Sequence, residues 1–89
     1  MDDRRKRLKF QANHRGMKET DLILSGFCKK HLSMMTDEQI DQFEDLLLNA
    51  PDQALYAWLT GREPVPTRFD TEIMELLKAF EFQGKSSYT

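Results

Sequence analysis

Residue types that commonly carry catalysis or cross-linking are scarce in this chain. Its single cysteine, Cys28, cannot form an internal disulfide, which favours a reducing compartment. The only histidines are His14 and His31. Cys28 and His31 could share a helix face, but a zinc site would need two further ligands that the sequence does not offer. We therefore interpret Cys28 as a small buried apolar side chain, and we expect no metal site.

Long apolar runs are also absent. No stretch reaches about 18 apolar residues, so we expect no insertion into a membrane. The first six residues carry charges with no apolar segment behind them, which predicts no secretory signal. A long mitochondrial transit peptide is missing too, although a trimmed chain would look the same. These features favour the bacterial cytoplasm, with the mitochondrial matrix as the alternative if this is a mature eukaryotic chain.

Motifs for catalysis and cofactor binding are missing as well. The sequence contains no Ser-His-Asp arrangement, no Gly-rich phosphate loop and no Gly-x-Gly-x-x-Gly fingerprint. We therefore expect a protein that is not an enzyme and that holds no cofactor of its own, FAD included. One predicted helix is crowded with acidic residues whose spacing is not that of a calcium loop, and we interpret them as a solvated face: Asp37, Glu38, Asp41, Glu44 and Asp45.

Residues that typically begin or end helices divide the 89-residue chain into five predicted helices, and no strand is predicted. Thr36 and Gln39 have the form of a capping box, and Gly26 suggests a kink or a close helix approach. Pro51 is expected in the first turn of a helix, and Pro64 and Pro66 in an extended segment. The prediction is an all-α fold, a small five-helix bundle over residues 1–84 with a flexible tail at 85–89. The helices are expected at about 3–13, 17–32, 37–48, 51–60 and 70–84.

Charge is distributed unevenly along the chain. Residues 1–19 hold seven Lys and Arg against three Asp and Glu, whereas residues 20–89 hold six against twelve. A basic arm on an acidic body could steer an acidic partner, and a solvated helix face is the alternative. The basic run at residues 4–9 raises nucleic acid as a partner. An overall pI of about 5.6 and a single neighbouring aromatic residue, Phe10, argue against it, so we expect no nucleic-acid binding.

The most informative segment is His14-Arg15-Gly16-Met17-Lys18-Glu19-Thr20-Asp21, at the junction of the first two predicted helices. Gly16 is expected to turn the chain in a backbone conformation that other residues avoid. Arg15 would then offer a bidentate donor close to the Glu19 carboxylate, a combination suited to docking on another macromolecule. The alternative is an internal cap, in which Arg15 pairs with Glu19 within the fold.

The same segment carries a family resemblance. The pattern Arg-Gly-Met-x-Glu-x-Asp, preceded by Arg-Lys-Arg-Leu-x-Phe-x-Ala-x-His, resembles the SdhE-type FAD assembly factors of succinate dehydrogenase. The similarity continues through residues 22–24, Phe27, residues 55–59 and the loop with Pro64 and Pro66, and so covers most of the chain. It implies a five-helix, non-catalytic factor that promotes covalent attachment of FAD to the flavoprotein subunit.

The resemblance also implies a binding site and partners. Arg15, Gly16 and Glu19 match the family's docking motif, and Met17 and Asp21 fit the same pattern less decisively. Basic positions around the first helix, Arg5, Arg7 and His14, are expected to extend the contact. The implied partner is the flavoprotein subunit of succinate dehydrogenase, with the fumarate reductase flavoprotein as a further candidate, and the factor is expected to be a monomer. A generic helical adaptor or regulatory protein with another partner is the alternative.

Overall fold

Five α-helices form the fold in the computed structural model, which describes residues 2–14 and 16–88, with side chains up to residue 80. No strand occurs in this described part of the chain, so the predicted all-α bundle of five helices is confirmed. The elements are α1 (Asp3–Asn13), α2 (Lys18–His31), the 3₁₀ helix η1 (Leu32–Met34), α3 (Asp37–Asn49), α4 (Asp52–Leu59), the 3₁₀ helix η2 (Thr67–Phe69) and α5 (Glu72–Tyr88).

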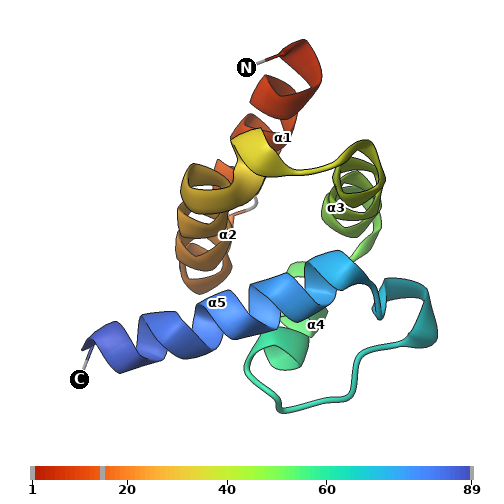
Figure 1. Ribbon diagram of the computed structural model, residues 1–89. Helices are drawn as coiled ribbons and strands as arrows, with labels where there is room; N and C mark the ends of the chain where they lie inside the picture. The colour runs from red at the N-terminus through yellow and green to blue at the C-terminus, as the bar shows by residue number, and fades with distance from the viewer. Residues whose placement is uncertain (1, 15, 89) are drawn as a thin grey trace.

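Helix α2 is the centre of the bundle. It packs against α1, α4 and α5, while α3 packs against α1 and α5, and α5 crosses the lower part of the molecule in Figure 1. Phe27 of α2 is fully buried, with its ring centroid 5.7 Å from that of Phe43 in α3 and 6.0 Å from that of Phe80 in α5. The apolar stripes of three helices therefore meet at Phe27, and α2 is fixed to the core along much of its length.

Two local signals in the sequence are confirmed. The Thr36 hydroxyl accepts a hydrogen bond from the Gln39 N–H at 3.1 Å, and the Gln39 side-chain oxygen accepts one from the Thr36 N–H at 3.0 Å. This capping box fixes the start of α3. Gly26 is a point of close helix approach, because a Cβ there would lie 2.9 Å from Cζ of Phe80.

Several predicted boundaries differ from the structure. The last helix continues through Gly84 to Tyr88, so the prediction that it ends by Gly84 is wrong. Glycine ends a helix efficiently by taking a left-handed conformation, and within the described chain only Gly16 and Gly61 have positive φ. Pro51 is the residue before α4, not part of its first turn. Residues 67 and 68, the last two of the segment 62–68 that was expected to be extended, belong to η2. The domain limits and the flexibility of residues 85–89 stay predictions.

Candidate docking site at the corner between α1 and α2

The chain reverses direction at Gly16, which has a φ of +98° and is exposed. Helix α1 ends at Asn13, three residues earlier, and the N–H of the following residue, His14, donates to the Gln11 carbonyl oxygen at 3.3 Å. A Cβ added at Gly16 would meet no atom within 4 Å. The predicted left-handed glycine is thus confirmed, and the space in front of it is open. We call residues 14–21 the docking corner.

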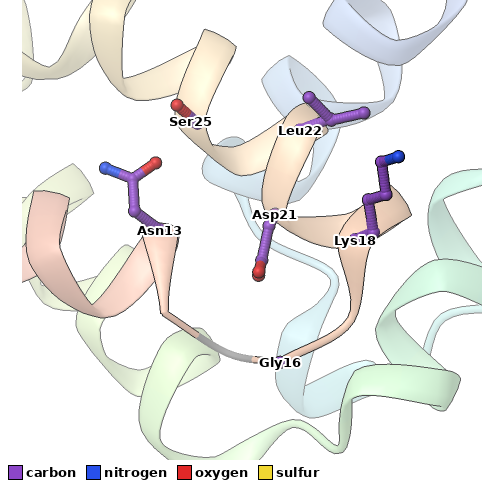
Figure 2. Close-up of a pocket in the computed structure, with 6 residues that line it drawn as sticks. All are labelled: Asn13, Gly16, Lys18, Asp21, Leu22 and Ser25. Carbon is purple, nitrogen blue, oxygen red and sulfur yellow. The ribbon is translucent and has the colours of Figure 1, made fainter.

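Helix α2 begins within this corner, with Met17 half-buried as the residue before its first turn. Glu19 and Asp21 lie in that first turn, where carboxylates are favoured by the helix dipole. The Glu19 side chain is exposed, and no ion pair joins it to another of the described residues. Asp21 is half-buried, has interactions of its own within the fold, and is directed into the curve of the connection that carries Gly16 (Figure 2).

Arg15 lies outside the described residues. The predicted contact of Arg15 with a partner, and the alternative in which Arg15 pairs with Glu19 within the fold, therefore both stay hypotheses. The structure does bring Gly16, Met17, Glu19 and Asp21 together at one exposed turn. Their grouping follows from their closeness in sequence and from the sharp change of direction at Gly16.

His14 and Arg7 lie on the exposed side of α1, as a partner contact requires. The His14 ring stacks on the Phe10 ring, with centroids 4.0 Å apart and planes 16° from parallel. Its Nδ1 donates to the Phe10 carbonyl oxygen at 2.7 Å, which holds the ring in this position. Arg7 precedes His14 by seven residues, or about two helical turns, so both can face the same partner.

Arg5, in contrast, has an internal structural role. Its Nε donates to the Leu32 carbonyl oxygen at 3.0 Å and its Nη2 to the Met35 carbonyl oxygen at 2.6 Å, while Nη1 pairs with Asp2 at 2.6 Å. The side chain is only 19% exposed. Arg5 therefore joins α1 to the segment that follows α2, a role that the sequence did not reveal, and its contact with a partner stays a prediction.

Replacing Arg5 with alanine should destabilise the protein by about 1.5–3 kcal/mol, because two carbonyl oxygens lose a charged donor. Urea unfolding followed by circular dichroism measures this change. Arg7→Ala is the matched control, since Arg7 is exposed on the same helix and its loss should cost less than about 0.5 kcal/mol. Equal stability of the two variants would contradict the internal role of Arg5.

Other charges of the basic segment and of α3 are also paired within the fold. Arg4 bonds to Asp41 and Glu44, and Arg68 pairs with Asp45 at 2.8 Å. The hydrogen bond from Arg68 lowers the pKa of Asp45. Lys6, Arg7 and Lys9 of the same basic run are exposed, so the absence of nucleic-acid binding stays a prediction. Within the described residues, no group of three His, Cys, Asp or Glu could hold a metal ion.

Cys28 and His31 of α2 both lie beside apolar side chains. Cys28 is 4% exposed, and burial raises the pKa of its thiol to about 12, so it is a protonated, unreactive group at neutral pH. Its predicted burial is confirmed. The His31 ring packs beside the Phe27 ring, with the two centroids 4.8 Å apart. Burial lowers the pKa of His31, and the nearby charge of Lys30 lowers it further.

Three hollows lined by described residues lie at the docking corner, with volumes of about 330, 470 and 340 Å³. The first and second share Gly16, and the second and third share Asp52, so they form a continuous uneven surface. The first, shown in Figure 2, is lined by Asn13, Gly16, Lys18, Asp21, Leu22 and Ser25. The second is lined by Gly16, Met17, Pro51, Asp52 and Gln53. The third is lined by Phe10, Gln11, His14, Leu47, Leu48 and Asp52.

Exposed apolar side chains concentrate in the same region. Among the described residues, four large apolar side chains are exposed, and three of them, Phe10, Leu22 and Leu48, line these hollows. Met34 does not line them. This group was not predicted from the sequence, although each of the three residues lies outside the buried stripe of its own helix. Apolar side chains clustered beside polar ones are typical of surfaces that bind another protein.

These features define a class of protein, a small all-α module with an exposed turn and exposed apolar side chains beside it. Within the part of the chain that the structure describes, every helix is too short or too polar to span a lipid bilayer. The sequence profile of the family described as flavinator of succinate dehydrogenase matches residues 6–81. The chain therefore belongs to this family, and the resemblance of its motif is confirmed.

Curated relatives agree with this assignment. The chain is 45% identical to succinate dehydrogenase assembly factor 2, mitochondrial, of Candida glabrata over 84 residues, which cover 90% of the chain and 54% of the relative. It is 43% identical to assembly factor 2-A, mitochondrial, of Drosophila ananassae and 42% identical to assembly factor 2-B, mitochondrial, of Drosophila melanogaster. Each of these matches covers 88% of the chain and 51% of the relative. The chain thus spans about half the length of the curated relatives it matches.

Proposed function

We propose that this protein promotes the covalent attachment of FAD to the flavoprotein subunit of succinate dehydrogenase by binding that subunit through the docking corner. The observation that carries the proposal is the family match over residues 6–81. The structure supports it because Gly16 and Glu19, two residues of the family motif, lie exposed at one turn. Arg7 and His14 would extend the contact along α1.

The proposed role is that of a helper without catalytic groups. A binding protein favours whichever conformation of its client it binds best, and the factor would select a flavoprotein conformation that places the attachment histidine against the flavin. Holding reacting groups in the correct orientation lowers the barrier without a chemical contribution from the helper. The burial and raised pKa of the Cys28 thiol fit such a role.

The surface of the corner does not fit FAD itself. A pyrophosphate favours a helix N-terminus with free N–H groups and no competing negative charge. Here the first turn of α2 carries the carboxylates of Glu19 and Asp21, and these would repel a phosphate. We therefore propose that the factor has no FAD site of its own and acts on FAD held by its partner.

Purified without its partner, the protein should accordingly be colourless and leave the fluorescence of added FAD unchanged. Gel filtration with excess FAD, followed by absorbance at the flavin maximum, measures retained cofactor. The apo flavoprotein subunit is the positive control in the same assay. Flavin that co-elutes with the factor in a one-to-one ratio would contradict the proposal and indicate a carrier of FAD.

Reconstitution from purified components tests the function directly. The apo flavoprotein is incubated with FAD, with and without this protein, and covalent flavin is detected by in-gel fluorescence after denaturation. The factor should increase the rate at which the fluorescent band appears. Equal rates with and without it would refute the proposal. The same assay with a fumarate reductase flavoprotein tests the second candidate client.

The names of the relatives bear on the compartment. They are mitochondrial proteins, which favours the mitochondrial matrix, the alternative in the sequence analysis, over the bacterial cytoplasm. We also propose that the factor acts as a monomer of 10.5 kDa that forms a one-to-one complex with its client. Sedimentation equilibrium of the factor alone and of the mixture distinguishes this from self-association.

A further inference from the structure

The third hollow at the docking corner contains an exposed aromatic side chain that is already held in place. Phe10 is 63% exposed, yet its ring stacks on His14, whose Nδ1 bonds to the Phe10 carbonyl oxygen. An exposed aromatic ring that loses little freedom on binding is an efficient anchor for a partner. The stacking thus gives Phe10 a property that an isolated surface phenylalanine lacks.

A second apolar side chain reaches this hollow from another helix. Leu48, in the last turn of α3, is 61% exposed, while its neighbour Leu47 is 6% exposed and belongs to the core. Both line the hollow with Phe10. Scattered exposed apolar residues are common on protein surfaces. Two that come from different helices and line one depression form a receptive apolar site of the kind found in interfaces.

The hollow is continuous with the docking corner. It shares Asp52 with the hollow that contains Gly16 and Met17, so a partner seated over Gly16 would also cover part of this surface. The polar side chains of Gln11 and His14 line it beside the apolar pair. An apolar centre beside polar groups matches the usual organisation of a protein interface.

Resting on the proposed function, we propose that the flavoprotein inserts an apolar side chain between Phe10 and Leu48. The docking surface would then extend from the corner across α1 to the C-terminal end of α3. Phe10 and Leu48 would supply affinity and orientation on this side, while the motif residues contact the client at the turn. Because the two contacts come from different helices, they would fix the rotation of the client as well as its position.

Affinity for the purified apo flavoprotein tests this proposal, measured by isothermal titration calorimetry with the full chain. Phe10→Gln and Leu48→Gln should each weaken binding about tenfold or more, and the double variant should lose less than the product of both because they hold the same group. Met34→Gln is the matched control, since Met34 is 82% exposed and lies outside the hollows. It should change affinity less than about twofold. Unaltered melting temperatures would show that the variants remain folded.

Each outcome distinguishes this inference from the proposed function. If Phe10→Gln and Leu48→Gln bind like the wild type while Gly16→Arg does not bind, the extended surface is refuted and the proposed function stands. If the wild-type chain does not bind the flavoprotein at all, the proposed function itself fails. If Leu48→Gln abolishes a self-association seen by sedimentation but leaves the affinity unchanged, the occupant is a second copy of this chain and the inference is wrong.

Discussion

Replacing Gly16 with arginine should abolish binding to the flavoprotein and flavin attachment while the protein stays helical. Gly16 has a φ of +98°, and a side-chain-bearing residue there costs roughly 1–2 kcal/mol of strain. The new side chain begins in open space, since its Cβ meets no atom of the fold within 4 Å. Its bulk would instead stand between the corner and the client. Titration calorimetry and in-gel flavin fluorescence measure the loss, and circular dichroism reports the fold.

Gly61→Arg is the matched control for this prediction. Gly61 also has a positive φ, +79°, and its Cβ position is equally empty, but it follows α4 and lines none of the three hollows. The two variants should therefore lose similar stability, and only Gly16→Arg should lose binding. Global unfolding of Gly16→Arg alone would support the internal-cap alternative, in which Gly16 serves the fold and not the client.

Much of this fold could be predicted from local patterns. Apolar residues at helical spacing, such as Leu24 and Phe27 in α2 or Ile40 and Phe43 in α3, are buried as expected. Helical spacing predicts burial because it places the apolar side chains on one face of the helix, and that face packs against the core. The turn at Gly16 and the helix cap at Thr36 could also be predicted from the sequence, because each depends on residues only a few positions away.

The interactions that were missed depend on contacts distant in sequence. Arg5 bonds to carbonyl oxygens 27 and 30 residues away, so counting charges could only describe it as part of a basic arm. The hollow between Phe10 and Leu48 arises from the packing of α1 beside α3, which no single helix pattern contains. The end of α5 was misjudged for a different reason, because Gly84 can either stop or continue a helix.

The position of α2 explains how so small a protein can present a defined binding surface. Helix α2 is packed by three other helices, so its first turn, with Glu19 and Asp21, is held against a rigid core. The preceding turn at Gly16 exposes that first turn instead of covering it. A pre-organised surface loses little conformational entropy on binding, which favours affinity from a modest contact area.

Glu19→Ala should weaken binding to the flavoprotein by about 2–5 kcal/mol, the usual range when one member of a desolvated charged contact is removed. The Glu19 side chain is exposed in the first turn of α2, where a client seated over Gly16 would contact it. Folding stability should fall by no more than the contribution of one carboxylate to the dipole of α2, about 0.3–1 kcal/mol. Calorimetric affinity and urea unfolding measure the two effects separately.

Glu38→Ala provides the control for Glu19→Ala, because Glu38 is likewise exposed and is the second residue of its helix, α3. It should lose the same small dipole contribution and keep full affinity. Arg15→Ala and the double variant with Glu19→Ala complete the test. If the two side chains contact the client, both single variants lose affinity. If they pair only with each other, each single variant loses folding stability, and the affinity for the flavoprotein does not change. The loss of stability in the double variant then differs from the sum of the two single losses. Unchanged affinity in all three variants would remove this corner as the docking site.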